Sequence, residues 1–311
     1  MVDLIVEYSR QSRIKENLRR RAKIVQVIRS FFMNHDYLEV DTPIRIPAPA
    51  PESHINAIKT ENWFLQTSPE LCMKRLLSSG YSRIFQISKC FRKGERGSKH
   101  LSEMSLLEWY ATGKNYSDLM IECESLIRHI LQELETGKYL VYQGKRIDMD
   151  SPWEKISVKD AFRKYAGLDL NDAIRSGDFD EIMGLEIEPQ LGNEVPAILF
   201  DYPYEKGALA KRKSSDPAFV ERFELYIAGI ELCNAFSELT DPEEQRIRFE
   251  AENTFRSQNG QDVYPIPERF LKSLQNMPEA SGIALGIDRL AMLFTDSLTI
   301  DEVTAFVTEE L

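Results

Sequence analysis

A segment near the C-terminus that combines glycines with an arginine has the residue types of an anion-binding turn. Its two glycines would let a strand and the start of a helix approach closely, and the free N–H groups at a helix start favour an anion. Arg289 emerges beside that junction. Taken alone, such a segment is more typical of a packed strand-to-helix turn than of a ligand site. It reads Gly282-Ile283-Ala284-Leu285-Gly286-Ile287-Asp288-Arg289-Leu290.

A second arginine that could bind phosphate lies far upstream. Arg92 follows Cys90-Phe91 and precedes a charged loop and a predicted strand at 103–110. Alternation along residues 83–92 places Arg92 on a polar face with Gln86 and Ser88. Arginine on such a face is a good bidentate partner for phosphate, and it suits a carboxylate across the sheet equally well.

The predicted strand 103–110 carries an acid on an apolar face. With a period of two residues, Glu108 shares its face with Met104, Leu106 and Tyr110. A carboxylate in such surroundings is unfavourable unless a cation pairs with it. That cation is either a side chain of the protein, which would make a structural salt bridge, or part of a ligand.

Further acids cluster at residues 222–238. Glu224 and Glu231 flank a predicted turn at 228–229, so a hairpin would bring their carboxylates together. Close carboxylates need a cation, and Mg²⁺ held by one or two of them plus nucleotide phosphates fits. Asn234 and Glu238 share a face and offer a polar pocket wall. The alternative is a solvated acidic face, which the apolar neighbours disfavour.

Glu70 follows Ser68-Pro69 at a predicted helix start. An acid at this position is expected for helix stability alone, because it faces the positive end of the helix dipole. Glu70 by itself therefore indicates no ligand.

Hydrophobic periodicity and turn signals predict an α+β domain built on an antiparallel β-sheet flanked by helices. An amphipathic helix is expected at 13–34, followed by a strand that ends at Pro43. Residues 83–92 and 103–110 read as a hairpin with a long polar tip. The other expected elements are helices at 70–80, 116–134, 155–190 and 242–259, a small hairpin at 139–149, and strands at 197–201, 222–227 and 230–238.

Composition narrows the class of protein. The 311 residues suit one large domain, no apolar run could cross a bilayer, and no secretory signal is visible, so we expect a cytoplasmic protein without membrane contact. The four cysteines and four histidines lack metal-ligand spacing, which favours reduced thiols and disfavours a zinc enzyme. A net charge of −11 favours a basic protein partner over a large nucleic acid.

Together these segments resemble the catalytic domain of lysyl-tRNA synthetases, which are class II aminoacyl-tRNA synthetases. The resemblance is closest to their stand-alone relatives, the elongation factor P lysyltransferases. It runs in family order over roughly residues 13–307. The matching segments are Thr67-Ser68-Pro69-Glu70-Leu71, Phe91-Arg92, Leu106-Leu107-Glu108-Trp109-Tyr110, Arg222-Phe223-Glu224, Gly229-Ile230-Glu231-Leu232, Asn234, Phe236-Ser237-Glu238-Leu239-Thr240-Asp241 and Gly286-Ile287-Asp288-Arg289-Leu290.

The resemblance implies a role for each matching residue. Arg92 and Arg289 would hold the ATP phosphates and stabilise charge while the lysine carboxylate attacks the α-phosphorus. Glu224 and Glu231 would carry Mg²⁺. The amino acid would be bound by Ser68, Pro69, Glu70, Glu108, Tyr110, Asn234, Glu238 and Ala284. ATP would be bound by Arg92, Lys93, Gly94, Glu95, His100, Leu101, Met104, Glu231, Leu232, Gly286 and Arg289.

Several positions, most of them between residues 93 and 104, depart from the lysyl-tRNA synthetase pattern, and three of the departures bear on ligand recognition. Gly94 stands where the family has the acid that reads the adenine amino group, and neighbouring Glu95 is the candidate substitute. Met104 stands where a phenylalanine would sandwich adenine, and methionine packs more loosely. Ala284 replaces a glycine, as it does in the lysyltransferases, where this change accompanies a preference for (R)-β-lysine. One methyl group gives discrimination on the order of 1–3 kcal/mol.

The resemblance implies a homodimeric ligase that activates lysine or (R)-β-lysine with ATP and transfers it to a lysine side chain of elongation factor P. The catalytic domain would span 13–311. We expect neither an N-terminal anticodon-binding domain nor tRNA anticodon contact, because only about a dozen residues precede the first helix. The alternatives are a catalytically degenerate module that binds lysine or nucleotide, and a lysyl ligase for another acceptor.

Overall fold

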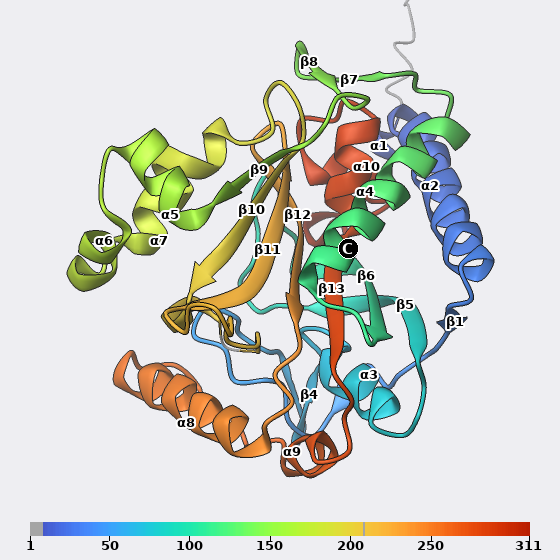
Figure 1. The fold of residues 1–311 in the computed structure, drawn as a ribbon. Helices are drawn as coiled ribbons and strands as arrows, with labels where there is room; N and C mark the ends of the chain where they lie inside the picture. Colours follow the sequence, from blue (N-terminus) through green and yellow to red (C-terminus); the bar gives the residue numbers. More distant parts are fainter. Residues whose placement is uncertain (1–8, 208) are drawn as a thin grey trace, which may run out of the picture.

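The centre of the molecule is an eight-stranded β-sheet (Figure 1). The computed structural model describes residues 9–207 and 209–311. Five neighbouring strand pairs are antiparallel, and the two edge strands pair in parallel, which confirms the predicted α+β class. In spatial order the strands are β1 (Leu38–Glu39), β5 (Arg83–Phe91), β6 (Glu103–Thr112), β13 (Ala280–Gly286), β12 (Ile230–Ser237), β11 (Phe219–Ile227), β10 (Ala197–Pro203) and β9 (Glu154–Ser157).

One face of this sheet is covered by three helices: α2 (Lys15–Asn34), α4 (Tyr116–Glu133) and α10 (Ile287–Phe294) (Figure 1). The apolar residues of α2 recur at helical spacing, and Ile24, Ile28 and Phe32 are fully buried against the sheet. The predicted helix 13–34 is thus present as α2. A short helix α1 (Arg10–Arg13) precedes it, and the two helices are separated by the non-helical residue Ile14.

The opposite face of the sheet carries alternate residues of the same strands. Ile84 and Tyr110 on this face join a second apolar cluster with α3 (Glu70–Leu77) and α9 (Glu268–Leu274). Farther along β6, Met104, Leu106 and Glu108 line a pocket. The period of two predicted for this strand therefore holds along its length.

The remaining elements surround this core. Residues 155–190, predicted as helical, form α5 (Val158–Ala161), α6 (Leu170–Ser176) and α7 (Phe179–Ile182), with π-helical turns at Phe162–Ala166 and Met183–Ile187. The predicted helix that Asp241 caps is α8 (Pro242–Gln258), and the small hairpin is β7 (Tyr139–Tyr142) with β8 (Lys145–Asp148). The sequence did not indicate the small sheet of β2 (Arg45–Ile46), β4 (Trp63–Leu65) and β3 (Lys59–Thr60).

Two further features concern the described residues as a whole. Among them, no helix combines the length and apolar character that crossing a bilayer requires. All four cysteines are free thiols, and the buried pair Cys123 and Cys233 lies with its sulfur atoms 3.8 Å apart.

Candidate active site

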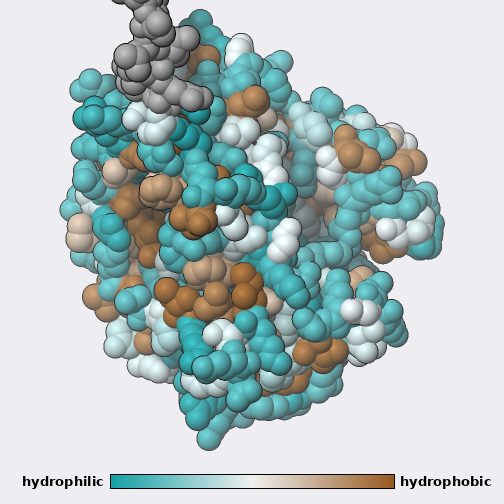
Figure 2. All heavy atoms as spheres, turned by 180° about the vertical axis from the view of Figure 1, so that it is seen from behind, coloured by the Kyte–Doolittle hydropathy of each residue, from teal (hydrophilic) through white to brown (hydrophobic). Residues whose placement is uncertain are grey.

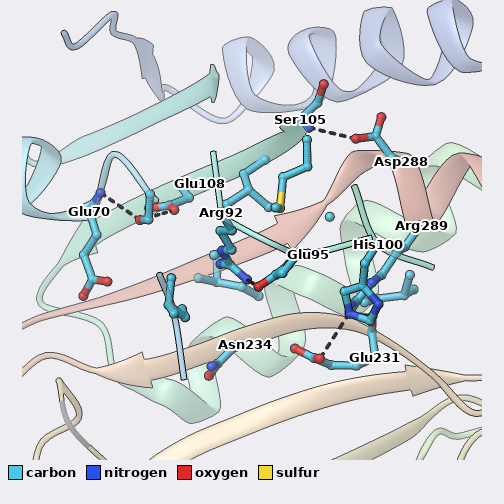
Figure 3. A pocket seen from close by; sticks show the side chains of 18 of the residues that line it. Glu70, Arg92, Glu95, His100, Ser105, Glu108, Glu231, Asn234, Asp288 and Arg289 are labelled. Atoms are coloured by element: carbon cyan, nitrogen blue, oxygen red, sulfur yellow. Dashed lines mark hydrogen bonds and ion pairs between the residues drawn. The ribbon is translucent and has the colours of Figure 1, made fainter. Parts of the chain in front are cut away.

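The register of the central strands aligns the polar residues of the predicted site in one row across the sheet. Asn234 on β12 lies opposite Ala284 on β13, which in turn lies opposite Glu108 on β6. The row continues to Glu224 on β11 and to Gln86 on β5. Residues that directly face each other across strands point to the same side of a sheet. Three members of this row, Asn234, Ala284 and Glu108, line the pocket, and Figure 3 shows Asn234 and Glu108 in it.

Glu108 is the deepest carboxylate of this row, with no exposed surface. Its two oxygens accept hydrogen bonds from the Ser68 hydroxyl at 2.6 Å and from the Tyr110 hydroxyl at 2.8 Å. Burial, followed by the nearby charge of Glu70, raises the pKa of Glu108 to about 7. A buried carboxylate that has neutral partners and no cation is suited to bind an ammonium group.

A lysine of the protein sits inside the acidic end of the pocket. The Lys74 ammonium contacts both the Glu70 and the Glu238 carboxylates and lies 5.0 Å from the centre of the Phe236 ring. Burial works against the charge of Lys74, but Glu238 and Glu70 hold its pKa above the ordinary value. Glu238 lies next to Gly282, where a Cβ atom would come within 2.4 Å of its carboxylate oxygen. One ammonium of the chain thus serves both Glu70 and Glu238, and it can balance the charge of only one of them.

Arg289 defines the other end of the pocket, at the start of α10. Its guanidinium donates to the Glu231 backbone oxygen at 2.8 Å and to the Glu231 carboxylate at 3.1 Å. It also lies 2.6 Å from His100 Nε2, whose pKa burial and Arg289 lower (Figure 3). The carboxylate of neighbouring Asp288 accepts from the Ser105 N–H at 2.8 Å, which ties this helix start to β6. These contacts hold Arg289 in a fixed orientation.

Arg92 lines the same end of the pocket and is less constrained than Arg289. Its guanidinium lies 3.8 Å from the Glu95 carboxylate, and within the described chain its buried Nε has no hydrogen-bond partner. Two arginines that line one cavity, one of them with an unpartnered donor, suit the binding of a polyphosphate.

The predicted magnesium ligands differ in accessibility. Glu231 lines the pocket, whereas Glu224 is buried and accepts hydrogen bonds from Tyr202 at 2.5 Å, from Tyr226 at 2.6 Å and from Arg222 at 2.6 Å. Burial raises the pKa of Glu224, Arg222 opposes this, and Glu231 adds to it. The described residues contain no group of three or more His, Cys, Asp or Glu that could hold a metal. Mg²⁺ is often held by one carboxylate and substrate phosphates, so Glu231 fits such an ion. Glu224 would have to give up one of its hydrogen bonds to coordinate it.

Most residues predicted for the site line this one pocket. From the predicted amino-acid set these are Ser68, Glu70, Glu108, Tyr110, Asn234 and Ala284, and from the ATP set Arg92, Glu95, His100, Leu101, Met104, Glu231, Leu232, Gly286 and Arg289. The residues outside the lining are Pro69, Lys93, Gly94, Glu224 and Glu238.

Sequence reasoning missed several lining residues, among them Glu52, Ile55 and Lys99. It also missed Lys74, which lies four residues after Glu70, a spacing that ordinarily indicates a surface ion pair on a helix. Glu52 lies in a proline-rich segment, and nothing in its sequence context indicates a ligand.

Comparison with known proteins places this geometry in a family. Residues 4–310 match the family model for tRNA synthetases class II (D, K and N). The chain is 38% identical over 308 residues to the elongation factor P–(R)-β-lysine ligase of Vibrio atlanticus, which covers 94% of this chain and 95% of that protein. The corresponding ligase of Pectobacterium atrosepticum is 37% identical over 313 residues, with the same coverage.

A lysine–tRNA ligase is also similar. The enzyme of Moorella thermoacetica is 36% identical over 333 residues, which cover 99% of this chain and 67% of that protein. The sequence analysis found a resemblance to elongation factor P lysyltransferases and to lysyl-tRNA synthetases, and these relatives carry the corresponding names. The chain therefore belongs to the family of tRNA synthetases class II (D, K and N).

Proposed function

We propose that the protein activates lysine or (R)-β-lysine with ATP and transfers the acyl group to a lysine side chain of elongation factor P. The observation that carries this proposal is a single pocket with an acidic end, where Glu108 is bonded only to hydroxyl groups, and a basic end, where Arg289 lies with Arg92, whose Nε has no partner among the described residues. Relatives that match nearly their whole length to this chain carry the name elongation factor P–(R)-β-lysine ligase. We take residues 13–311 as the catalytic unit.

Different residues of the pocket bind the substrate and stabilise the charge that develops during the reaction. Glu108 and Tyr110 hold an amino group of the substrate, so that its carboxylate points toward the arginines. That carboxylate attacks the α-phosphorus of ATP and pyrophosphate leaves, while Arg92 and Arg289 stabilise the charge on the phosphate oxygens. In the second step the neutral acceptor amine attacks the carbonyl carbon of the adenylate, the bond to AMP breaks, and the amine proton passes to the departing AMP phosphate or to solvent. The first step needs no dedicated proton-transfer dyad in the protein.

Nucleotide recognition draws on the loop between β5 and β6 and on the start of β6. Glu95 of the loop and Met104 of β6 line the pocket together with Arg289, so both remain candidates for adenine contact. Mg²⁺ would neutralise phosphate charge when bound, with Glu231 as its pocket-facing ligand and Glu224 behind it. Because Glu95, Met104 and Glu231 all line the pocket, their positions favour an active enzyme over a degenerate binding module.

Ala284 supports (R)-β-lysine as the preferred isomer. It lies in the sheet between Asn234 and Glu108, so its methyl group projects from the floor on which the substrate would rest. A methyl group here narrows the pocket, which favours the substrate whose amino group stands one carbon farther from the carboxylate. Discrimination on the order of 1–3 kcal/mol is expected.

The test of the proposal is ATP–pyrophosphate exchange by the purified protein, measured separately with α-lysine and with (R)-β-lysine. Exchange that depends on either lysine supports adenylate formation, and the ratio of kcat/KM values assigns the isomer. A folded protein that binds ATP but exchanges with neither lysine would favour the degenerate binding module. Exchange without transfer to elongation factor P would favour a ligase for another acceptor, including tRNA.

The affinity for lysine should depend on pH through Glu108. Only its carboxylate form pairs with an ammonium group, and burial raises its pKa to about 7. The KM for lysine should therefore fall as the pH rises from about 6 to about 8, by roughly tenfold per pH unit below the pKa. In a Glu108→Gln variant the KM should be higher and its pH dependence shallower. A wild-type KM that stays constant over this range would contradict the assignment.

We further propose that the protein forms a homodimer through the edge of the sheet at β1. Figure 2 shows hydrophobic residues gathered in patches on an otherwise hydrophilic face. The exposed apolar residues near β1 include Met33, Leu38 and Ile44, with exposures of 57%, 51% and 43%. Grouped exposed apolar side chains are typical of protein interfaces. Light scattering should give twice the mass of one chain for the wild type and a monomer for Leu38→Glu; a wild-type monomer would refute the dimer.

A further inference from the structure

The loop between β5 and β6 (residues 92–102, here the nucleotide loop) forms one wall of the pocket but contributes little to the core. Glu95 and His100 of this loop lie in the pocket (Figure 3), and no side chain of residues 92–100 is buried in the core. The loop also contains Gly94, at a φ of 81°, and Gly97, and glycines widen the range of accessible backbone conformations. Its position therefore depends on polar contacts with neighbouring segments.

The base of the nucleotide loop is held by the segment that precedes β3. The Lys93 N–H donates to the Asn56 backbone oxygen at 2.6 Å. Asn56 is in turn fixed by the fully buried Arg256 of α8, which donates to its side chain at 2.8 Å and to the backbone oxygen of Glu52 at 2.7 Å. This anchor fixes one end of the loop and leaves its tip to be held by another part of the chain.

The tip of the nucleotide loop is held by the C-terminal segment (residues 300–310). Arg96 donates to the two carboxylate oxygens of Asp301 at 3.0 and 2.8 Å, and to those of Glu309 at 2.8 and 3.3 Å. Beside it, the Ile300 N–H donates to the Ser98 backbone oxygen at 2.8 Å. Paired hydrogen bonds between a guanidinium and carboxylates fix direction as well as distance. One arginine thus joins the loop to two carboxylates of the C-terminal segment.

The C-terminal segment is itself firmly attached to the body of the protein. Its first 3₁₀ turn, Ile300–Val303, packs next to α2 and α10 with both end residues buried. Its second turn, Thr308–Glu310, is tied to α1 by Arg10, which donates to the two oxygens of the Glu310 carboxylate at 2.6 and 2.5 Å. Arg10 also donates to the Thr304 backbone oxygen at 3.1 Å. The segment can therefore serve as a fixed support for the loop.

An arginine on this loop could instead bind a phosphate group directly, but the contacts of Arg96 favour support of the loop. Arg96, Asp301 and Glu309 all lie outside the set of residues that line the pocket. All three nitrogens of its guanidinium donate to these two carboxylates, so turning toward the pocket would break every one of those bonds. Arg92, which lines the pocket with an unpartnered Nε among the described residues, is the better phosphate donor.

We infer that the C-terminal segment positions the nucleotide loop through Arg96, and that this contact sets the affinity for ATP. The inference rests on the proposed function, in which the loop binds ATP. If a loop occupies its binding position only part of the time, the apparent Kd rises by the inverse of that fraction. Loss of the contact should therefore weaken ATP binding. The lysine site should be unaffected, because Glu108 and Asn234 lie on strands of the central sheet. Arg96 is a positioning residue, since it touches neither substrate.

The test compares three variants with wild type in ATP–pyrophosphate exchange: Arg96→Gln, Asp301→Asn and Glu309→Gln. Arg96→Gln should raise the KM for ATP by roughly three- to tenfold, and each acid variant should raise it by a smaller factor. The KM for lysine, the kcat and the midpoint of thermal unfolding should stay close to the wild-type values. The Arg96→Gln/Asp301→Asn double variant should match Arg96→Gln alone, because both changes remove the same contact.

Hydrogen exchange gives a second readout that does not depend on activity. The backbone amides of residues 96–100 should exchange faster in all three variants, while the Lys93 amide, held by Asn56, should exchange as in the wild type. Arg246→Gln is the matched control, because Arg246 makes the same paired contact with Glu268, at 2.9 and 2.6 Å, between α8 and α9. It should change neither the exchange of the loop amides nor the KM for ATP.

Two results would overturn the inference. One is a raised KM for ATP in Arg96→Gln together with unchanged values in both acid variants, which would mean that Arg96 binds the nucleotide itself. The other is unchanged hydrogen exchange of the loop amides in all three variants. Absence of pyrophosphate exchange in the wild type, with faster amide exchange in the variants, would instead overturn the proposed function and leave the support of the loop standing.

Discussion

The Arg289→Ala variant should lose ATP–pyrophosphate exchange by roughly 10³-fold, with most of the loss in kcat. Arg289 stands at the start of α10, and its guanidinium is oriented by Glu231, His100 and the backbone oxygen of Lys99. A donor held in this way stabilises charge on phosphate oxygens without having to reorganise during the reaction. Removing it leaves lysine binding at the opposite end of the pocket intact.

Two measurements separate this catalytic loss from a structural one. Thermal unfolding of Arg289→Ala should show a native fold, and the affinity for lysine, measured by calorimetry, should stay within about threefold of the wild-type value. Arg175→Ala is the control, because Arg175 is an exposed residue that pairs only with Asp172 at the surface. Exchange within tenfold of wild type in Arg289→Ala would contradict its role in the chemistry.

The Lys74→Met variant should be strongly destabilised and should bind lysine poorly. Methionine has a similar length but no charge, so Glu70 and Glu238 would be left in the pocket wall without their shared cation. Breaking a buried ion pair from one side costs about 3–5 kcal/mol. The free energy of unfolding from denaturant titration measures this loss. A Lys74→Met/Glu238→Gln double variant should recover part of it, because one uncompensated charge is removed.

The loss caused by Lys74→Met should also depend on pH. Burial, only partly offset by Lys74, raises the pKa of Glu238 to about 8, above its unfolded value of 4.5. For an acid whose folded pKa is raised, stability is fully present below the unfolded pKa and is lost as the pH rises through the folded pKa. Removing Lys74 raises that pKa further, so both proteins lose stability alike up to about pH 8, and the difference from wild type should widen as the pH rises above about 8.

A second lysine variant tests whether the loss of stability is specific to the buried ion pairs of Lys74. Lys164 pairs with Glu154 in a partly exposed ion pair at 2.9 Å, and Lys164→Met should cost less than about 1 kcal/mol at any pH. Equal losses in the two lysine variants, or a loss for Lys74→Met that does not vary with pH, would refute the account of the pocket charges.

Strand alternation and one turn signal were enough to predict which polar residues share a face and which two strands form a hairpin. The period of two on β6 puts Glu108 and Tyr110 on one face, and the turn at 228–229 pairs β11 with β12, so that Glu224 faces Asn234. Local patterns of this kind follow from backbone geometry, which the sequence expresses directly. The family resemblance named Ala284 as a site residue, and only the structure gives the register that brings it between Asn234 and Glu108.

Contacts between distant segments could not be predicted in the same way. Lys74 has the spacing of an ordinary helical ion pair with Glu70, and only tertiary packing places it against Glu238. The loop of Glu52 depends on Arg256, about 200 residues later in the chain, whose buried side chain gives no periodic signal. The same limit applies to Glu224, whose tyrosine partners come from packing within the sheet.

Transfer of labelled (R)-β-lysine to elongation factor P is the most direct test of the central claim. The purified protein, ATP and Mg²⁺ should attach label to elongation factor P with a stoichiometry near one, and the label should disappear when the acceptor lysine is replaced by arginine. Labelling of tRNA under the same conditions should remain at background. Label on tRNA, or on neither acceptor while pyrophosphate exchange proceeds, would contradict the assignment of elongation factor P as the substrate.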